Sequence, residues 1–169
     1  MAIGNLGSAM TQLQGYIASE FNASATQAHN QGLSLLPDLV RRIAARADLS
    51  YNNLRVTAPR LNTSSDVTVE AGAVGLIAVV AQGNTTGTED QAVLTYEAAV
   101  TEGTTRYTTA LNLDQSSTVF STYMAVYPEP IPMAALYWSA VSNGADTDIE
   151  GTELADASSI RVMLVYAEA

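Results

Sequence analysis

The sequence contains no cysteine, no lysine and only one histidine, His29. Without cysteine, the chain can form no disulfide, no thiolate metal site and no cysteine nucleophile. His29 lies in the polar stretch Thr-Gln-Ala-His-Asn-Gln-Gly, and no pattern around it supplies the partners of a catalytic triad or a metal cluster. We therefore interpret His29 as a solvated histidine in a linker.

Charged residues are also scarce, at 14% of the sequence, where a typical soluble domain has about a quarter. Thr, Ser, Asn, Gln and Ala take their place, and these residues suit strand faces and turns. No run of about 18 apolar residues is present, so we expect no transmembrane helix. The first ten residues lack the basic and continuous apolar regions of a secretory signal, and we expect none.

The few charges are distributed unevenly along the chain. Residues 1–60 hold five arginines against three acids, a net charge of +2, whereas residues 61–169 hold two arginines against fourteen acids, a net charge of −12. The acidic part should repel nucleic acids and anionic membranes. We therefore expect neither nucleic acid nor membrane as a partner.

The N-terminal segment has apolar residues at alternating spacings of three and four, which predict one amphipathic helix with a seam like that of a coiled coil. The pattern covers fewer than three heptads and is too short for an autonomous coiled coil. The seam must therefore pack either on its own domain or on a neighbouring subunit, and we select it as a candidate oligomer interface: Ile3, Leu6, Met10, Leu13 and Ile17.

A second helix is expected after a break at Gly32, with Pro37 and Asp38 in its first turn and its end near Asp48. Three arginines lie opposite its apolar face. They are candidates for docking onto the acidic β domain of a neighbouring copy. The alternative is an ordinary solvated face whose arginines pair with Asp38 and Asp48. These candidate docking residues are Arg41, Arg42 and Arg46.

From about residue 51 onward, short strand-like runs alternate with turn residues. This pattern predicts an antiparallel β-sandwich or jelly-roll over residues 51–169, after a helical arm or oligomerisation region over residues 1–50. The last run alternates cleanly and should be a central strand or meet a partner. The prolines of 128–132 should cross between sheets or cover an edge. The expected strands are 67–70, 73–82, 92–101, 105–113, 119–127, 134–142 and 160–167.

The densest acidic cluster offers a weak calcium candidate, formed by Asp146, Asp148 and Glu150. Their spacing matches the start of an EF-hand loop, but Ala157 stands where the closing carboxylate should be. A looser calcium site in a β loop and an ordinary solvated loop remain as alternatives. We expect no resident cofactor.

No nucleotide-binding or hydrolase motif is present, and no pair of acids is singled out by spacing. We therefore expect no enzymatic activity. Tyr137 and Trp138 allow two interpretations, an aromatic platform for a sugar or part of the core. The second function that we consider follows from the first of these, a fibre, spike or adhesin subunit that binds a cell-surface glycan through the β domain.

The layout of the chain resembles virion structural proteins of tailed phages and tailed viruses, especially head decoration or cement proteins. The heptad-like start, the Thr- and Ala-rich β domain and the closing strand Ser159-Ile-Arg-Val-Met-Leu-Val-Tyr-Ala-Glu carry the resemblance. It implies a capsid-stabilising homo-oligomer, often trimeric, that is made in the host cytoplasm and seated on the major capsid protein or other virion proteins. No motif aligns, so no site residue is transferred.

Overall fold

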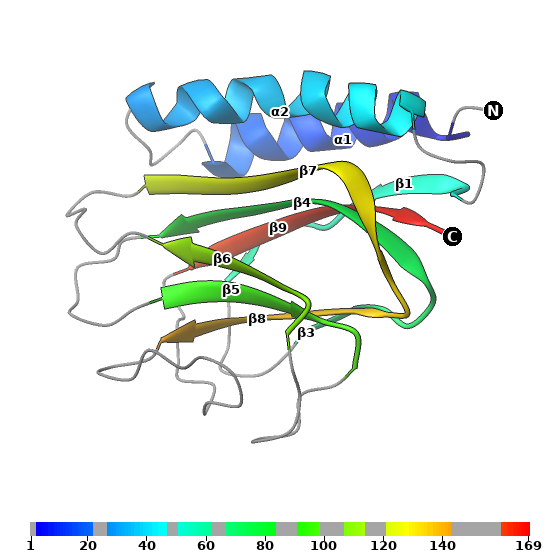
Figure 1. Ribbon diagram of the computed structural model, residues 1–169. Coiled ribbons are helices and arrows are strands. Elements are labelled where there is room, and N and C mark those ends of the chain that lie inside the picture. The colour runs from blue at the N-terminus through cyan, green and yellow to red at the C-terminus, as the bar shows by residue number, and fades with distance from the viewer. Residues whose placement is uncertain are drawn as a thin grey trace.

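The computed structural model describes residues 3–21, 27–46, 51–61, 67–83, 91–98, 107–113, 121–142 and 160–169. In this part of the chain, two helices cover one face of a β-sheet, and a second sheet covers the other face (Figure 1). The expected mainly β fold, with N-terminal helices before an antiparallel sandwich, is confirmed.

The helical layer consists of α1 (Leu6–Tyr16), which continues as a short π-helical segment, η1 (Ile17–Phe21), and of α2 (Gln27–Arg46). The predicted start of the second helix was wrong, because α2 begins at Gln27 and contains both Gly32 and Pro37. Burial of Leu33, Leu36 and Val40 on the sheet outweighs the poor helix propensity of these two residues. Within the described part, neither helix has the length and apolarity needed to cross a bilayer.

The nine strands of the described residues form two antiparallel sheets. Sheet A has the order β1 (Asn53–Val56), β9 (Arg161–Glu168), β4 (Val74–Gly83) and β7 (Ser121–Met133), and β2 (Arg60–Leu61) also pairs with β9. Sheet B has the order β3 (Val67–Glu70), β8 (Leu136–Ser142), β5 (Gln91–Tyr96) and β6 (Thr109–Leu113). All seven expected strands are present, whereas β1 and β2 were not predicted.

Sheet A is the middle layer, and both of its faces are buried. On β9, Val162, Leu164 and Tyr166 point into the core between the sheets. Met163 and Val165 point into the core beneath the helices. The alternation predicted for this strand is therefore confirmed, and so is its central position between β1 and β4.

Strand β4 also contributes side chains to both cores, and it contains a β-bulge at Ile77. The register with both neighbours shifts between Leu76 and Ala78. As a result, Leu76 and Val79 face sheet B although they are three residues apart, and Ile77 and Ala78 both face the helices. The extra residue thus reverses, beyond the bulge, which alternate side chains of β4 face sheet B and which face the helices.

Strand β7 is the last strand of sheet A on its side, and it leaves the ladder at Pro128 and Pro130 before it pairs again at Ile131 and Pro132. Its pairing with β4 passes from Val126 directly to Ile131, so Pro128 and Pro130 oppose no residue of β4. In Figure 1 the strand bends here and descends toward sheet B, where β8 follows. The expectation that these prolines lie on an edge or cross between sheets is confirmed.

The division into a helical arm over residues 1–50 and a separate β domain over residues 51–169 needs correction. The helices share one continuous core with sheet A, to which Phe21 and Leu36 contribute from the helices and Val80 and Met163 from the strands. The helical region is therefore a layer of the sandwich, because without it one face of sheet A would be exposed to water.

Candidate interaction surfaces

The apolar stripe of the first helix faces its own chain. Leu13 is fully buried, Ile3, Met10 and Ile17 are buried as well, and Leu6 packs partly buried against the same core. The selection of these five side chains as an oligomer interface is therefore corrected. Periodicity predicted the buried face, but it does not specify what covers that face, and here sheet A does.

The three candidate docking arginines do not form a single face. Arg42 pairs with Asp38 through a 3.0 Å contact one helical turn apart, and Arg46 Nε donates to the Arg42 carbonyl oxygen at 3.3 Å. Arg41 lies on another side of the helix, where it lines a groove between α1 and α2. The pairing with Asp38 was the alternative considered for this segment, and it holds for Arg42. An exposed pair of this kind contributes about 0–1 kcal/mol.

That groove is open and has a volume of about 320 Å³. Gln14, Ile17 and Ala18 line it from the first helical segment, and Ser34, Pro37, Asp38 and Arg41 line it from α2. The groove therefore marks the side of α2 that faces α1.

On a different side of α2 lie two leucines that the sequence pattern did not single out. Leu35 is 61% exposed and Leu39 is 38% exposed, and they are the large hydrophobic side chains that the described surface exposes. Successive helical side chains are rotated by about 100°, so both leucines point away from the groove. We call the surface formed by Leu35, Leu39, Arg42 and Arg46 the α2 flank.

The α2 flank lies above the β7 edge of sheet A. A Cβ atom at Gly32 would lie 3.8 Å from Met124 Cε of β7, so this side of α2 faces β7. Leu39 follows Gly32 by seven residues, about two helical turns, and therefore lies on the same side. The flank is thus a partly apolar surface at the edge of the sheet.

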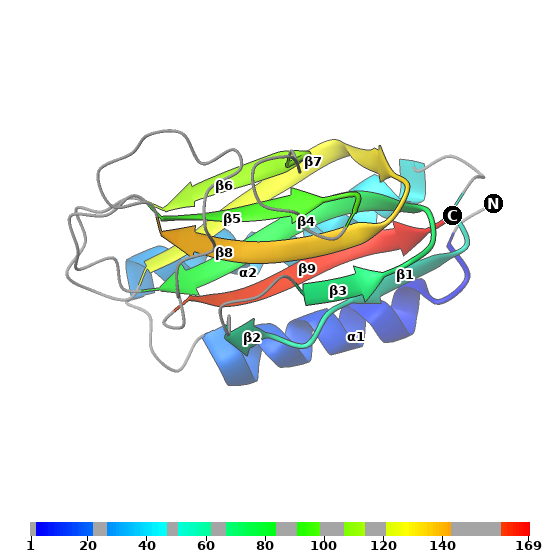
Figure 2. The ribbon, with the colours of Figure 1, turned by 90° about the horizontal axis from the view of Figure 1, so that it is seen from below.

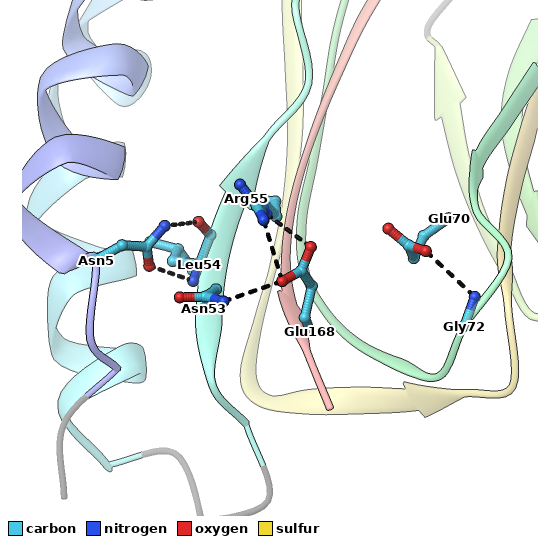
Figure 3. A network of polar contacts seen from close by, with 7 residues as sticks. All are labelled: Asn5, Asn53, Leu54, Arg55, Glu70, Gly72 and Glu168. Atoms are coloured by element: carbon cyan, nitrogen blue, oxygen red, sulfur yellow. Dashed lines mark hydrogen bonds and ion pairs between the residues drawn. The ribbon is translucent and has the colours of Figure 1, made fainter.

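At the opposite side of the sandwich, polar contacts hold the ends of β1 and β9 (Figure 3). Arg55 donates to both carboxylate oxygens of Glu168, at 2.7 and 3.3 Å, and Asn53 Nδ2 donates to Glu168 Oε2 at 3.2 Å. The hydrogen bonds from Arg55 are the main cause that lowers the pKa of Glu168. Burial, and then the nearby charge of Glu70, raise the pKa of Tyr166.

The start of α1 closes the outer edge of β1. Asn5 Nδ2 donates to the Leu54 carbonyl oxygen at 2.7 Å, and the Leu54 amide donates to Asn5 Oδ1 at 2.7 Å (Figure 3). The Gly4 amide donates to the Asn52 carbonyl oxygen at 3.1 Å. Asn5 thus acts as the next residue of a neighbouring strand would. This explains why so short and polar a strand as β1 is stable.

A pocket of about 260 Å³ lies between the two sheets at this side, lined by Arg60, Val67, Trp138 and Tyr166 among others. Trp138 is only 2% exposed and belongs to the core between the sheets, so its interpretation as a core residue is confirmed. Tyr137 is partly buried on sheet B and packs with Tyr96. Trp138 therefore offers no exposed face on which a sugar could stack.

The calcium candidates Asp146, Asp148 and Glu150 lie outside the described residues. His29 belongs to α2, so it is not in a linker, but the description does not extend to its side chain. Among the described residues, no group of three or more histidine or acidic side chains is arranged to hold a metal ion.

Comparison with known proteins does not identify a family for this chain. No family model matches the chain, and no curated protein or solved structure is significantly similar to it. The α2 flank, the helical groove and the closed β1 edge are therefore the observations from which a function is inferred.

Proposed function

We propose that this chain is a virion structural protein, a capsid decoration or stabilising subunit that assembles as a homo-oligomer. The observation that carries the proposal is the α2 flank, where Leu35 and Leu39 are exposed although the other large hydrophobic side chains of the described residues are buried or half-buried. Burying one leucine side chain contributes about 1.5–3 kcal/mol. Two neighbouring exposed leucines on one helix supply the apolar centre that a protein interface buries.

The low charge of the chain supports a permanent assembly. Charged residues are depleted at the centres of protein interfaces, and obligate interfaces resemble a domain core cut in half. Only 14% of these residues are charged, and 47% are hydrophobic. A chain that covers much of its surface with copies or with a lattice needs fewer charges to stay in solution.

The fold supports the same role mechanically. Sheet A is held between two cores, and the end of η1 is fastened to it by hydrogen bonds. Gln82 Nε2 donates to the Phe21 carbonyl oxygen at 2.8 Å, and Arg161 donates to the Glu20 carbonyl oxygen at 2.8 Å. These bonds satisfy carbonyl groups that a helix end leaves unpaired. The end of the first helical segment is thus anchored on sheet A, beside the helix α2 that bears the flank.

The experiment is quantitative mass spectrometry of purified virus particles from the source, with the major capsid protein as internal standard. A decoration subunit should occur at a copy number that stays in a fixed, high ratio to the capsid protein through successive purification steps. Material from uninfected cells, purified in the same way, is the control. Absence from the particles, or only a few copies per particle, would contradict the proposal.

A further inference from the structure

The two long sides of the sandwich differ in how their edges are closed. Figure 2 shows β1, β2 and β3 along one side and β6 and β7 along the other. On the first side, Asn5 and Gly4 form hydrogen bonds with the outer backbone groups of Leu54 and Asn52. Charged residues follow at Arg55, Arg60 and Glu70. Short strands and charges of this kind protect an edge from pairing with another chain.

In the part of the chain that the structure describes, the side formed by β6 and β7 carries little such protection. Both are terminal strands of their sheets, and β7 is 13 residues long. Residues 121–127 of β7 and all of β6 contain no charged residue and no proline. The prolines and the acid of β7 are confined to residues 128–132. Since natural proteins commonly protect a long, uncharged edge, this side has the character of one that a partner covers.

We infer that a second copy of the chain packs against this side about a two-fold axis, with α2 antiparallel to its counterpart and the two β7 strands side by side. The inference rests on the homo-oligomer of the proposed function and names its contact surface. A rotational ring of three would need two different surfaces on each copy. A two-fold contact uses the same surface twice, and within the described residues the β6–β7 side shows no polar closure like that of Asn5 and Gly4 on β1.

The layer spacings agree with this arrangement. Neighbouring strands lie about 4.8 Å apart, and α2 covers the β7 edge of sheet A, where Gly32 faces Met124. If each α2 lies over the outer two strands of its sheet, the two helices are about 10 Å apart, which is at the upper end of the usual helix-packing range of about 8–10 Å. The helices would therefore touch when the edges meet.

The α2 flank is self-complementary in this arrangement. Leu35 and Leu39 are four residues apart, so an antiparallel two-fold contact centred between them places Leu35 of one copy opposite Leu39 of the other. Arg42 lies beyond the leucines, already paired with Asp38, and would border the contact. An apolar centre with a polar rim is the usual anatomy of a protein interface.

The size of the side is also sufficient. Helix α2 has 20 residues, which gives a length of about 30 Å, and three layers spaced by about 10 Å give a height of about 30 Å. The product is about 900 Å², close to the roughly 800 Å² per partner of a stable interface.

The first test is the mass of the purified chain by light scattering over a wide concentration range. The wild type should be a dimer, and the double variant Leu35→Glu, Leu39→Glu should dissociate at least about 100-fold more readily, since two buried leucines are lost. Ala45→Glu, an exposed site elsewhere on α2, is the matched control and should remain dimeric. Circular dichroism verifies that each variant is folded.

The second test uses the absence of cysteine from the chain. Under mild oxidation, Leu35→Cys combined with Leu39→Cys should give a covalent dimer, whereas Ala45→Cys should not. The inference is overturned if the wild-type chain stays monomeric at all concentrations. It is also overturned if the chain is a monomer whose α2 flank binds a different virion protein. An oligomer that is unchanged in the double glutamate variant also overturns this contact but leaves the proposed function standing, which the particle copy number tests separately.

Discussion

At the scale of single residues, Gly75 is the position where a side chain is least tolerable. A Cβ atom there would lie 2.5 Å from Tyr51 Cζ and 2.7 Å from Pro130 Cβ. Both distances are far below van der Waals contact, so β4 can pass between these two rings only as glycine. This close approach is one reason why the proline-rich part of β7 can fold over the end of β4.

Gly75→Ala should therefore destabilise the chain by about 1–3 kcal/mol, the usual cost of overpacking. Gly15→Ala is the control, because a Cβ there meets nothing within 4 Å and the residue lies in α1. It should stabilise the chain by about 0.5–1 kcal/mol. Urea unfolding of both variants measures the difference. If Tyr51→Ala fails to restore part of the stability lost in Gly75→Ala, the clash lies elsewhere.

A second prediction at this scale concerns Glu168, whose pKa is lowered in the folded chain by the hydrogen bonds from Arg55. An acid with a lowered folded pKa stabilises the fold above its unfolded pKa of about 4.3. This contribution is lost as the pH falls through the folded value. Glu168→Gln should thus lower the melting temperature at pH 7, and the difference from wild type should shrink below about pH 4. Glu129→Gln, exposed on β7, is the control. A difference that is the same at pH 7 and pH 3 would contradict this assignment.

At the scale of elements, α1 is a structural layer, which Leu13 tests most cleanly because it is fully buried in the helix–sheet core. Leu13→Ala should lower the free energy of unfolding by about 2–5 kcal/mol. The measurement is chemical denaturation at a concentration low enough to exclude assembly. If the variant loses assembly but keeps the stability of the wild type, α1 is an interface arm after all.

The arginines of α2 remain candidates for docking onto the acidic region of a neighbouring copy, which is a contact other than the two-fold side. The region from residue 61 onward has a net charge of −12, and the summed field of several charges speeds association even where each pair is weak. The triple variant Arg41→Gln, Arg42→Gln, Arg46→Gln should assemble more slowly than wild type at low salt. The two should converge at high salt, since the Debye length is about 3 Å at 1 M. Equal rates at low salt would show that these arginines are ordinary surface residues.

Much of this element structure could be predicted from the sequence. Alternation located β9 and its two faces, and the three-four spacing located the buried side of α1. Strands β1 and β2 could not be found, because four or two residues give no periodicity and a side-chain contact from Asn5 completes β1. The start of α2 was missed because Gly32 and Pro37 are local breakers, whereas the burial that overrides them depends on the whole fold.

The candidate surface was less predictable than the fold. Helical periodicity placed Leu36 with Val40 and Ile43 on one apolar face, and all three are buried. Leu35 and Leu39 lie off this face and are exposed, but the periodicity does not show that they form a surface of their own. The sequence predicted an apolar helix face for assembly but placed it on α1, whereas the structure exposes apolar side chains on α2.

At the scale of the whole molecule, the helical layer, sheet A and sheet B form one body with unlike sides. One side is closed by Asn5, Arg55 and Glu168, and the other presents the α2 flank above β6 and residues 121–127 of β7, which carry no charge. Such asymmetry suits a subunit that meets its own copy on one side and leaves its remaining surfaces to a lattice.

The most direct test of a capsid decoration role is an add-back measurement on particles made without this chain. Purified wild-type chain should bind them to saturation at a high, fixed ratio to the major capsid protein and raise the temperature at which the particles release their genome. The variant Leu35→Glu, Leu39→Glu should bind with lower apparent affinity, because paired subunits bind more tightly than single ones. Particles that bind no wild-type chain, or that bind it with no change in release temperature, would contradict the account.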